Sequence, residues 1–446
     1  MEKFRKLGLG EHILRSIKEA GFESPMEIQE KAIPLALAGK DIIGGSATGS
    51  GKTLAFGAAI VEKTFKERGI QSLILAPTRE LAEQDASEMA KFSKYKGLSV
   101  SIIYGGVGMA PQVESLEKAN IVVGTPGRIL DHMRRGTLNL SKVRFLVLDE
   151  ADRMLDMGFI DDVETIINQC PKERQTFLFS ATITPDIEHI AKRHMRNPVD
   201  VAAEQHVDPS KLRQIYYDVQ PNEKFSFLVH LLKNEKSNIV MIFCNTRHNV
   251  EFISHNLKRN GVQAIAIHGG LAQNKRSRVM EQFKANEVYA LVCTDIAARG
   301  LDIAGVSHVY NYDSPKTSKD YIHRIGRTAR AGKEGIAISI VSNRDYDNFR
   351  AVLKDPSIEI KKEEVPENIE RAFMQINARG ERGEGRRFGG GSRFGGGGRS
   401  YGRSGGGSGG FRGRSERGER RGGSRFGSGG RGRGFGRSGE GQRRRY

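Results

Sequence analysis

The sequence is poor in cysteine and has no long apolar run. Its three cysteines, Cys170, Cys244 and Cys293, match neither a zinc site nor a disulfide framework in their spacing, which favours a reducing compartment. Cys244 and Cys293 stand in apolar runs, where buried, unreactive thiols are expected. No run of the roughly 18 apolar residues that a membrane helix needs is present, and residues 1–10 do not resemble a signal peptide. We therefore expect a cytoplasmic protein without a membrane span.

Lysine is absent from the C-terminal end of the chain, where arginine is abundant. Residues 379–446 contain 19 Arg, no Lys and five Glu, so they carry +14 of the formal net charge of +18 and leave +4 for residues 1–378. Such an excess indicates a polyanionic partner, either nucleic acid or an anionic membrane surface. Arginine also stacks on bases, which lysine cannot do. Aromatic residues that can stack in the same way recur at Phe388, Phe394, Tyr401, Phe411, Phe426, Phe435 and Tyr446.

This tail is dominated by glycine, arginine and serine. Such a composition predicts disorder, because it offers too little apolar surface to offset the entropy of ordering. We interpret the tail as an RNA-binding tether that raises the local concentration of RNA. An inert solubilising tail is the alternative, and condensate formation is a further one.

Short apolar runs alternate with helical stretches along most of the chain. The candidate strands are residues 41–44, 72–76, 145–148, 176–179, 239–243, 263–267, 290–293, 308–310 and 336–340. Strands that are apolar throughout are typical of parallel α/β sheets that are covered on both faces. The pattern pauses in the proline-containing stretch 197–214, which suits a linker. We therefore predict two tandem doubly wound parallel-sheet domains. The predicted parts are a first domain at 1–205, a linker at 206–213, a second domain at 214–355, a charged extension at 356–378 and the tail at 379–446.

A phosphate-binding loop is predicted between a short strand and a helix. It consists of Ser46, Ala47, Thr48, Gly49, Ser50, Gly51, Lys52 and Thr53. Its glycines let backbone N–H groups surround phosphates, and the N-terminus of the following helix favours negative charge. Lys52 would reach the β- and γ-phosphates of ATP, and the Thr53 hydroxyl would hold Mg²⁺. Ser46 stands where the generic pattern has its first glycine, and a loop that merely resembles the motif is the alternative.

Two carboxylates follow another predicted strand. Asp149 and Glu150 come directly after the apolar run 145–148, about 100 residues beyond the phosphate loop. At such a strand end one carboxylate can hold Mg²⁺ and its neighbour can orient or deprotonate the attacking water. We assign the metal to Asp149 and the water to Glu150. The alternative is a solvated helix start, the usual place for acidic clusters.

The run Asp149-Glu150-Ala151-Asp152 resembles the defining motif of the DEAD-box RNA helicases. Further motifs of that family follow in the family's order at 21–29, 76–81, 105–106, 125–128, 180–182, 242–246, 273–276, 294–302 and 323–330. About a dozen short motifs in fixed order make the resemblance specific, and it covers roughly residues 1–350. It implies two RecA-like domains and an RNA helicase that hydrolyses ATP with Mg²⁺. Ala329 stands where many members have glycine, and we expect little effect from this difference.

The resemblance also implies roles at the nucleotide. Gln29 would read adenine through its amide, Phe22 would stack on the base, and Phe4 would be the family's upstream aromatic. Asp302 would contact the ribose. Arg327 and Arg330 would be arginine fingers that reach the γ-phosphate, since a guanidinium spreads positive charge over several oxygens. A surface glutamine and core-packed phenylalanines are the alternatives for the adenine site.

Two further groups of residues are implied by the resemblance. Those that would couple the nucleotide site to the RNA site are Asp152, Ser180, Thr182 and His323; for Ser180 and Thr182, local capping is the alternative. Those that would contact RNA are Pro77, Thr78, Arg79, Gly105, Gly106, Thr125, Pro126, Gly127, Arg128, Asn245, Thr246, Arg276 and Thr294. Contacts to phosphates and 2′-hydroxyls predict little sequence preference. An RNA-annealing scaffold and a DNA helicase are the competing functions.

Overall fold

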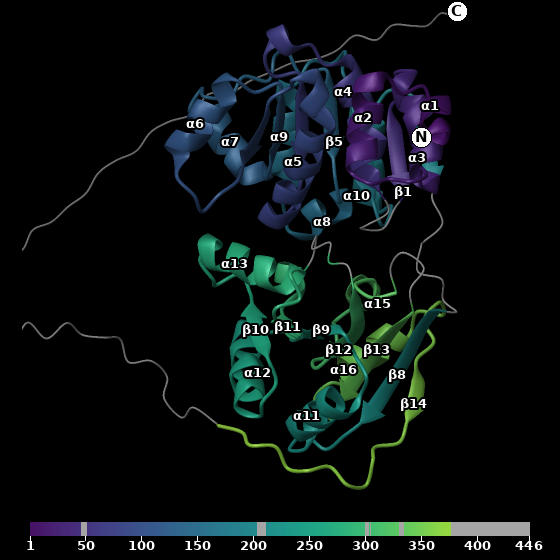
Figure 1. Cartoon of the computed structure of the whole chain (residues 1–446), viewed down its shortest axis with the longest axis vertical. Coiled ribbons are helices and arrows are strands. Elements are labelled where there is room, and N and C mark those ends of the chain that lie inside the picture. The colour runs from purple at the N-terminus through teal and green to yellow at the C-terminus, as the bar shows by residue number, and fades with distance from the viewer. Residues whose placement is uncertain (46–50, 203–210, 299–302, 304, 330–333, 376–446) are drawn as a thin grey trace, which may run out of the picture. The chain divides into compact units, whose positions relative to one another are not determined.

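Two seven-stranded parallel sheets organise this computed structural model, which describes residues 1–45, 51–202, 211–298, 303, 305–329 and 334–375. The first sheet has the strand order β3-β4-β2-β5-β6-β1-β7 (Figure 1). Its strands are β1 (Ile42–Gly45), β2 (Ser72–Leu75), β3 (Val100–Ile103), β4 (Ile121–Gly124), β5 (Phe145–Leu148), β6 (Gln175–Ser180) and β7 (Val199–Ala202). Because all pairings within it are parallel, the carboxyl ends of its strands share one edge.

Helices cover both faces of the first sheet. Side chains alternate along β2, so that Leu73 and Leu75 enter one hydrophobic cluster while Ile74 enters the other. The first cluster is closed by α1 (Glu2–Lys6), α2 (Glu11–Glu19), α3 (Glu27–Leu37), α4 (Lys52–Lys63) and α5 (Arg79–Ser93). The second is closed by α6 (Met109–Glu117), α7 (Pro126–Arg134), α8 (Ala151–Asp156), α9 (Ile160–Gln169) and α10 (Pro185–His194). Two short 3₁₀ helices, η1 (Lys66–Arg68) and η2 (Lys94–Lys96), lie in the connections.

The second sheet repeats this plan, with the strand order β10-β11-β9-β12-β13-β8-β14. Its strands are β8 (Leu212–Asp218), β9 (Ile239–Phe243), β10 (Ala264–Ile267), β11 (Ala290–Cys293), β12 (Val306–Asn311), β13 (Gly335–Val341) and β14 (Lys361–Glu363). Its helices are α11 (Lys224–Asn234), α12 (Arg247–Arg259), α13 (Gln273–Lys284), α14 (Asp295–Ala298), α15 (Ser318–Ile325) and α16 (Tyr346–Leu353). The predicted fold class, two doubly wound parallel-sheet domains in tandem, is confirmed.

The strands differ from the prediction in the stretch between the two sheets. Every predicted strand is present, but the stretch 197–214, interpreted as a linker, also contains β7 and the start of β8. Both strands join their sheets by parallel pairing, β7 with β1 and β8 with β13. The domain boundaries themselves remain predictions.

The charged extension does more than follow the second domain. Its β14 pairs with β8, and Val365, Ile369 and Ala372 pack against the cluster beneath α11 and α12. Figure 1 shows the segment after β14 passing along these helices. The backbone N–H of Ala372 donates to Ser226 Oγ on α11 at 3.1 Å, and that of Gln375 donates to Asn256 Oδ1 on α12 at 2.7 Å. Residues 361–375, which we call the strap, are thus part of the second domain's packing.

All three cysteine thiols are free and buried. Burial raises the pKa of Cys170 to about 11 and raises the pKa of Cys244 and Cys293 well above the usual value of a thiol. The predicted burial of Cys244 and Cys293 is therefore confirmed, and a raised thiol pKa lowers the fraction of reactive thiolate. In the described part of the chain no helix is both long and apolar enough to cross a membrane.

Candidate active site and nucleic-acid surface

The predicted nucleotide residues lie at neighbouring strand ends of the first sheet. Since β5, β6 and β1 are adjacent, the residues that follow them come together at one edge. Lys52 and Thr53 open α4 beyond β1, and Asp149 follows β5. Gly51 caps α4 with a left-handed backbone, φ +83°, where a glycine is unstrained. Ser46, Ala47, Thr48, Gly49 and Ser50 lie outside the described residues.

Lys52 and Asp149 form a buried ion pair. Lys52 Nζ lies 3.0 Å from Asp149 Oδ1, and the two residues are 6% and 2% exposed. Asp149 Oδ1 is buried and makes no hydrogen bond to the described residues beyond this ion pair. The mutual attraction of a buried ion pair offsets only part of the cost of removing both charges from water. The pair is therefore suited to exchanging partners with phosphate and a cation.

Glu150 occupies a strained position beside this pair. It is the N-cap of α8 with φ 48° and ψ 53°, a left-handed conformation that costs a non-glycine residue roughly 1–2 kcal/mol. Strain of this kind gathers at functional sites. Its carboxylate forms an ion pair with Arg153, which is itself buried. The sequence prediction did not include Arg153.

Asp152 and Thr182 connect the ends of β5 and β6. Thr182 Oγ1 donates to Asp152 Oδ2 at 2.9 Å, while Ser180 Oγ donates to the carbonyl oxygen of Thr182 at 2.7 Å. Ser180 therefore makes a local contact, as expected from the local-capping alternative, whereas Thr182 donates to a residue of helix α8. The fourth predicted coupling residue, His323, lies on α15 of the second domain.

Gln29 is fully buried and joins α3 to the start of α4. Its Oε1 accepts from the backbone N–H of Met26 at 3.0 Å, and its Nε2 donates to the carbonyl oxygen of Gly51 at 3.0 Å. The alternative of a surface glutamine is therefore wrong. Phe22 is half-buried, 6.3 Å from Phe92 between ring centroids, and Phe4 is fully buried in the core. Their contact with a base remains a prediction.

Asp85 is a charged group at this site that the sequence prediction missed. It lies on α5, is 1% exposed, and its Oδ1 accepts from Thr53 Oγ1 at 3.4 Å. Burial raises the pKa of Asp85 well above its ordinary value, and the negative charge of Asp149 adds to the rise. The signal in the sequence was an acid at the helical spacing of the buried residues Leu81, Ala82 and Met89.

The RNA-type motifs of the first domain occupy the adjoining strand ends. Because β3, β4 and β2 are neighbours, the loops that follow them meet. Thr78 caps α5 by accepting from the Leu81 N–H at 3.3 Å, and the Arg79 guanidinium lies so close to Gly106 that a Cβ there would collide with it. Arg128 Nη2 donates to the carbonyl oxygen of Val107 at 2.8 Å. Pro77 precedes Thr78, Gly105 precedes Gly106, and Thr125, Pro126 and Gly127 begin α7. The first-domain RNA candidates thus form one continuous set of loops.

In the second domain Arg324 holds the motif loops together. It is 1% exposed, and it donates to Asn245 Oδ1 at 2.8 Å and to both carboxylate oxygens of Asp295 at 2.6 and 2.7 Å. Asn245 follows β9 and Asp295 follows β11, so one side chain ties two adjacent strand ends. The sequence prediction gave Arg324 no role. Of the remaining RNA candidates, Thr246 caps α12, Arg276 lies on α13 and Thr294 directly precedes α14.

The structure describes residues 323–329 of the predicted arginine-finger motif. Arg327 is 5% exposed and its Nε donates to the carbonyl oxygen of His323 at 3.2 Å. Arg327 is therefore buried and is not an exposed basic residue on a helix. Arg330 and Asp302 lie outside the described residues. Ala329 has φ +54°, the left-handed region in which glycine is unstrained, so the alanine at this position has a conformational cost that the sequence did not reveal.

Two doubly wound sheets whose strand ends carry a lysine, carboxylates and a capped helix N-terminus define a two-domain RecA-like nucleotide-binding protein. Models of the DEAD/DEAH box helicase family and of the helicase conserved C-terminal domain match residues 26–190 and 223–332. The ATP-dependent RNA helicase CshA of Listeria monocytogenes is 48% identical over 356 residues, which are 79% of this chain and 68% of that protein. The chain belongs to the DEAD-box family of ATP-dependent RNA helicases.

Solved structures agree with this assignment. A DEAD box protein from Methanococcus jannaschii is 43% identical, with a TM-score of 0.51, and the match covers 81% of this chain and 98% of that one. Dbp5 from Saccharomyces cerevisiae, bound to RNA and ADP BeF3, is 33% identical with a TM-score of 0.75, and the match covers 82% and 96% of the two chains.

Proposed function

We propose that the carboxyl ends of β1, β5 and β6 bind and hydrolyse ATP, and that the loops after β2, β3 and β4 bind the RNA backbone. The chain is an ATP-dependent RNA helicase and an ATPase. The observation that carries the proposal is the buried Lys52–Asp149 pair beside the strained Glu150, on the same sheet edge as Thr78, Arg79 and Arg128.

Mg²⁺ fits the donors of this site. Asp149 Oδ1 is buried with no hydrogen bond beyond its ion pair to Lys52 among the described residues, and Thr53 presents a hydroxyl next to Lys52 in the chain. Carboxylate and hydroxyl oxygens are the hard ligands that Mg²⁺ takes, usually together with phosphate oxygens. Bound there, the ion would offset negative charge on the phosphates. Asp149 and Thr53 would hold it.

The remaining nucleotide roles follow from charge and geometry. Lys52 would leave Asp149 for the phosphates, and Glu150 would orient or deprotonate the attacking water. Arg327 and Arg330 would stabilise the charge that develops on the γ-phosphoryl oxygens. Gln29 has one donor and one acceptor position left after its two hydrogen bonds, which is what an adenine edge requires. Phe22 would stack on the base, Phe4 would support it, and Asp302 would bind the ribose.

Coupling between ATP and RNA would pass through the Asp152–Thr182 hydrogen bond. A change at the γ-phosphate would move the residues after β5 and β6, and these neighbour the loops that we assign to RNA. If the two domains close on ATP, each ligand stabilises the closed state and promotes binding of the other. Bending of one strand at Thr125–Arg128 would then separate a duplex locally. RNA–protein complexes would be remodelled by the same movement.

The experiment is RNA-stimulated ATP hydrolysis by the full chain. Glu150→Gln should lower the saturated kcat by about 10²–10⁴-fold, the usual contribution of a general base, while nucleotide binding persists. The matched control is Glu173→Gln, an exposed glutamate of the same domain. Absence of stimulation by RNA would contradict the proposed coupling, and survival of stimulated hydrolysis in Glu150→Gln would contradict the role of Glu150. Equal stimulation by matched DNA would contradict RNA selectivity.

A further inference from the structure

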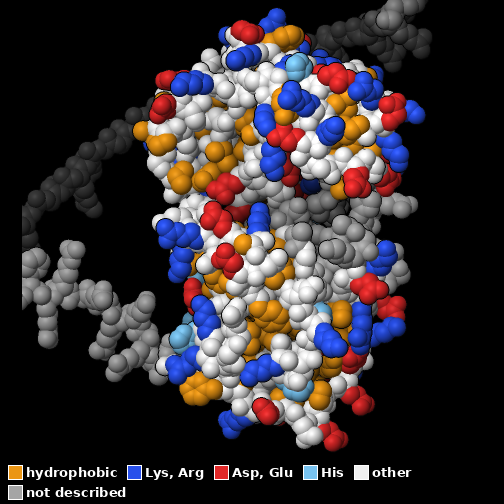
Figure 2. Space-filling model, viewed as in Figure 1, with side chains coloured by type: hydrophobic (Ala, Val, Ile, Leu, Met, Phe, Trp, Pro, Cys, Tyr) orange, Lys and Arg blue, Asp and Glu red, His pale blue; other side chains and the backbone are white. Residues whose placement is uncertain are grey.

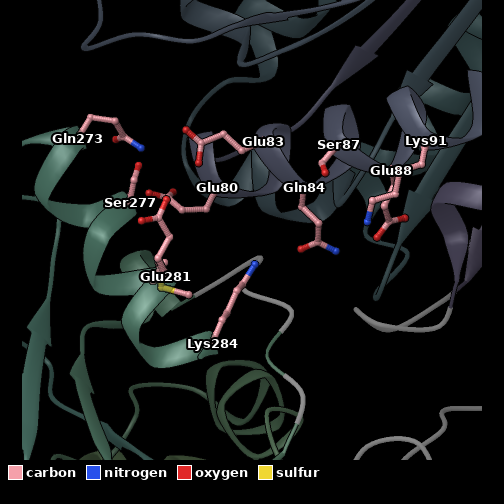
Figure 3. A pocket seen from close by; sticks show the side chains of 11 residues that line it. Glu80, Glu83, Gln84, Ser87, Glu88, Lys91, Gln273, Ser277, Glu281 and Lys284 are labelled. Carbon is pink, nitrogen blue, oxygen red and sulfur yellow. The ribbon is translucent and has the colours of Figure 1, made fainter. Parts of the chain in front are cut away.

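Helix α5 carries one carboxylate on the face that it buries. Figure 3 shows Glu80, Glu83, Gln84, Ser87 and Glu88 projecting from the other side of this helix. On the buried face, Leu81, Ala82 and Met89 are at most 2% exposed, and Asp85 stands among them at 1%. An apolar side chain would suit that position better, because burying a carboxyl group costs free energy.

The two oxygens of Asp85 have different surroundings. Oδ1 accepts the hydroxyl of Thr53 at 3.4 Å, across the contact between α5 and α4. Oδ2 is buried and has no hydrogen-bond partner among the described residues. Lys52 and Asp149 lie near enough for their charges to act on the pKa of Asp85, Lys52 lowering it and Asp149 raising it. Because most buried polar atoms in proteins have a hydrogen-bond partner, the burial of Asp85 Oδ2 without one is not explained by packing.

We propose that Asp85 is a positioning residue for the Thr53 hydroxyl at the metal site. A hydroxyl has one proton and two lone pairs, so a proton committed to Asp85 leaves the lone pairs for a cation. Orientation of a ligating group by an acceptor behind it is a general feature of metal sites, and its loss lowers metal affinity by about 10–100-fold. The inference rests on the proposed function, since it takes Thr53 as a ligand of Mg²⁺.

The test compares ADP affinity in Mg²⁺ and in EDTA, by titration calorimetry on the full chain. Asp85→Leu removes the acceptor and should weaken ADP binding in Mg²⁺ by about 10-fold or more, on the scale given above, with much less change in EDTA. Asp85→Asn retains an acceptor oxygen and should restore most of the Mg²⁺-dependent gain. The control, Met89→Leu on the same buried face, should leave both affinities unchanged.

The thermal stability of Asp85→Leu distinguishes a positioning role of Asp85 from a role in packing. Asp85→Leu should melt no lower than the unmodified chain, because it removes a buried carboxyl group. Equal loss of ADP affinity in Mg²⁺ and in EDTA, or a full Mg²⁺ gain in Asp85→Leu, overturns the inference. Failure of the proposed function is distinguishable, since the unmodified chain would then show no Mg²⁺ gain at all.

Discussion

The amide of Gln29 illustrates how much one side chain does at this site. It is fully buried, and its two hydrogen bonds run to Met26 before α3 and to Gly51 before α4. A Cβ at residue 51 would collide with Gln29 Nε2 and displace that amide, and the φ of +83° also favours glycine there. The groups that would face adenine and phosphate are thus held by the same contact.

We predict that Gln29→Glu raises the KM for ATP by about 5–150-fold, since loss of a buried hydrogen bond costs about 1–3 kcal/mol. A carboxylate can still accept from Met26, but it cannot donate to Gly51 or to a base. Discrimination between ATP and GTP should fall as well. Steady-state kinetics with both nucleotides measure this, and Glu30→Ala, an exposed neighbour on α3, is the control. An unchanged KM would contradict a role in adenine recognition.

Residue types at the site were predictable from the sequence, whereas their partners were not. Lys52, Thr53 and Asp149 were found because motif spacing identifies them. Asp85 and Arg324 were missed, because their importance comes from contacts between elements far apart in the chain. An acid on an apolar helix face was a visible signal for Asp85, but only the fold shows that Thr53 lies opposite.

At the scale of elements, most of the predicted strands are apolar because they are buried on both faces, although β4, which is also buried throughout, was not predicted. β9 is buried throughout and was predicted with its observed bounds. β8 alternates between buried and partly exposed residues, and β14 is Lys-Lys-Glu with no apolar residue. Such strands form because a neighbouring strand supplies hydrogen bonds, and that neighbour cannot be read from a local pattern.

We predict that the strap contributes to the stability of the second domain. Truncation after Asp355 removes β14 and the hydrogen bonds to Ser226 and Asn256, which are worth roughly 1 kcal/mol each. The melting temperature of the second domain should therefore fall by at least about 4–8 °C, at roughly 2–4 °C per kcal/mol. Truncation after Ala378 keeps the strap and is the matched control. Equal melting of the two truncations would show that the strap adds no stability.

At the scale of the whole molecule, the net positive charge is distributed unequally between residues 1–378 and the tail. Residues 1–378 carry +4 of the formal net charge of +18 and the tail carries +14. Figure 2 shows acidic and basic side chains interspersed on the visible face of the described residues. Non-specific attraction to a polyanion scales with the number of cationic contacts. We therefore propose that most of this attraction comes from the tail.

Truncation after Ala378 should raise the KM for RNA and weaken its dependence on salt, with little change in kcat at saturating RNA. The reason is that fewer phosphate contacts release fewer counterions. ATPase rates against RNA concentration at two or more salt concentrations measure both effects. A large drop in saturated kcat would mean that the tail takes part in turnover itself.

The Lys52–Asp149 ion pair has a consequence for the order of events. Without nucleotide, the charges of Lys52 and Asp149 neutralise each other. If phosphate alone paired with Lys52, the buried carboxylate of Asp149 would lose its partner. If a cation alone paired with Asp149, the buried ammonium of Lys52 would lose its partner. If phosphate and Mg²⁺ bind this pair as proposed, binding of either one would be disfavoured without the other, and the two would enter together. By the same reasoning, departure of either component would let Lys52 and Asp149 pair again and would weaken binding of the other.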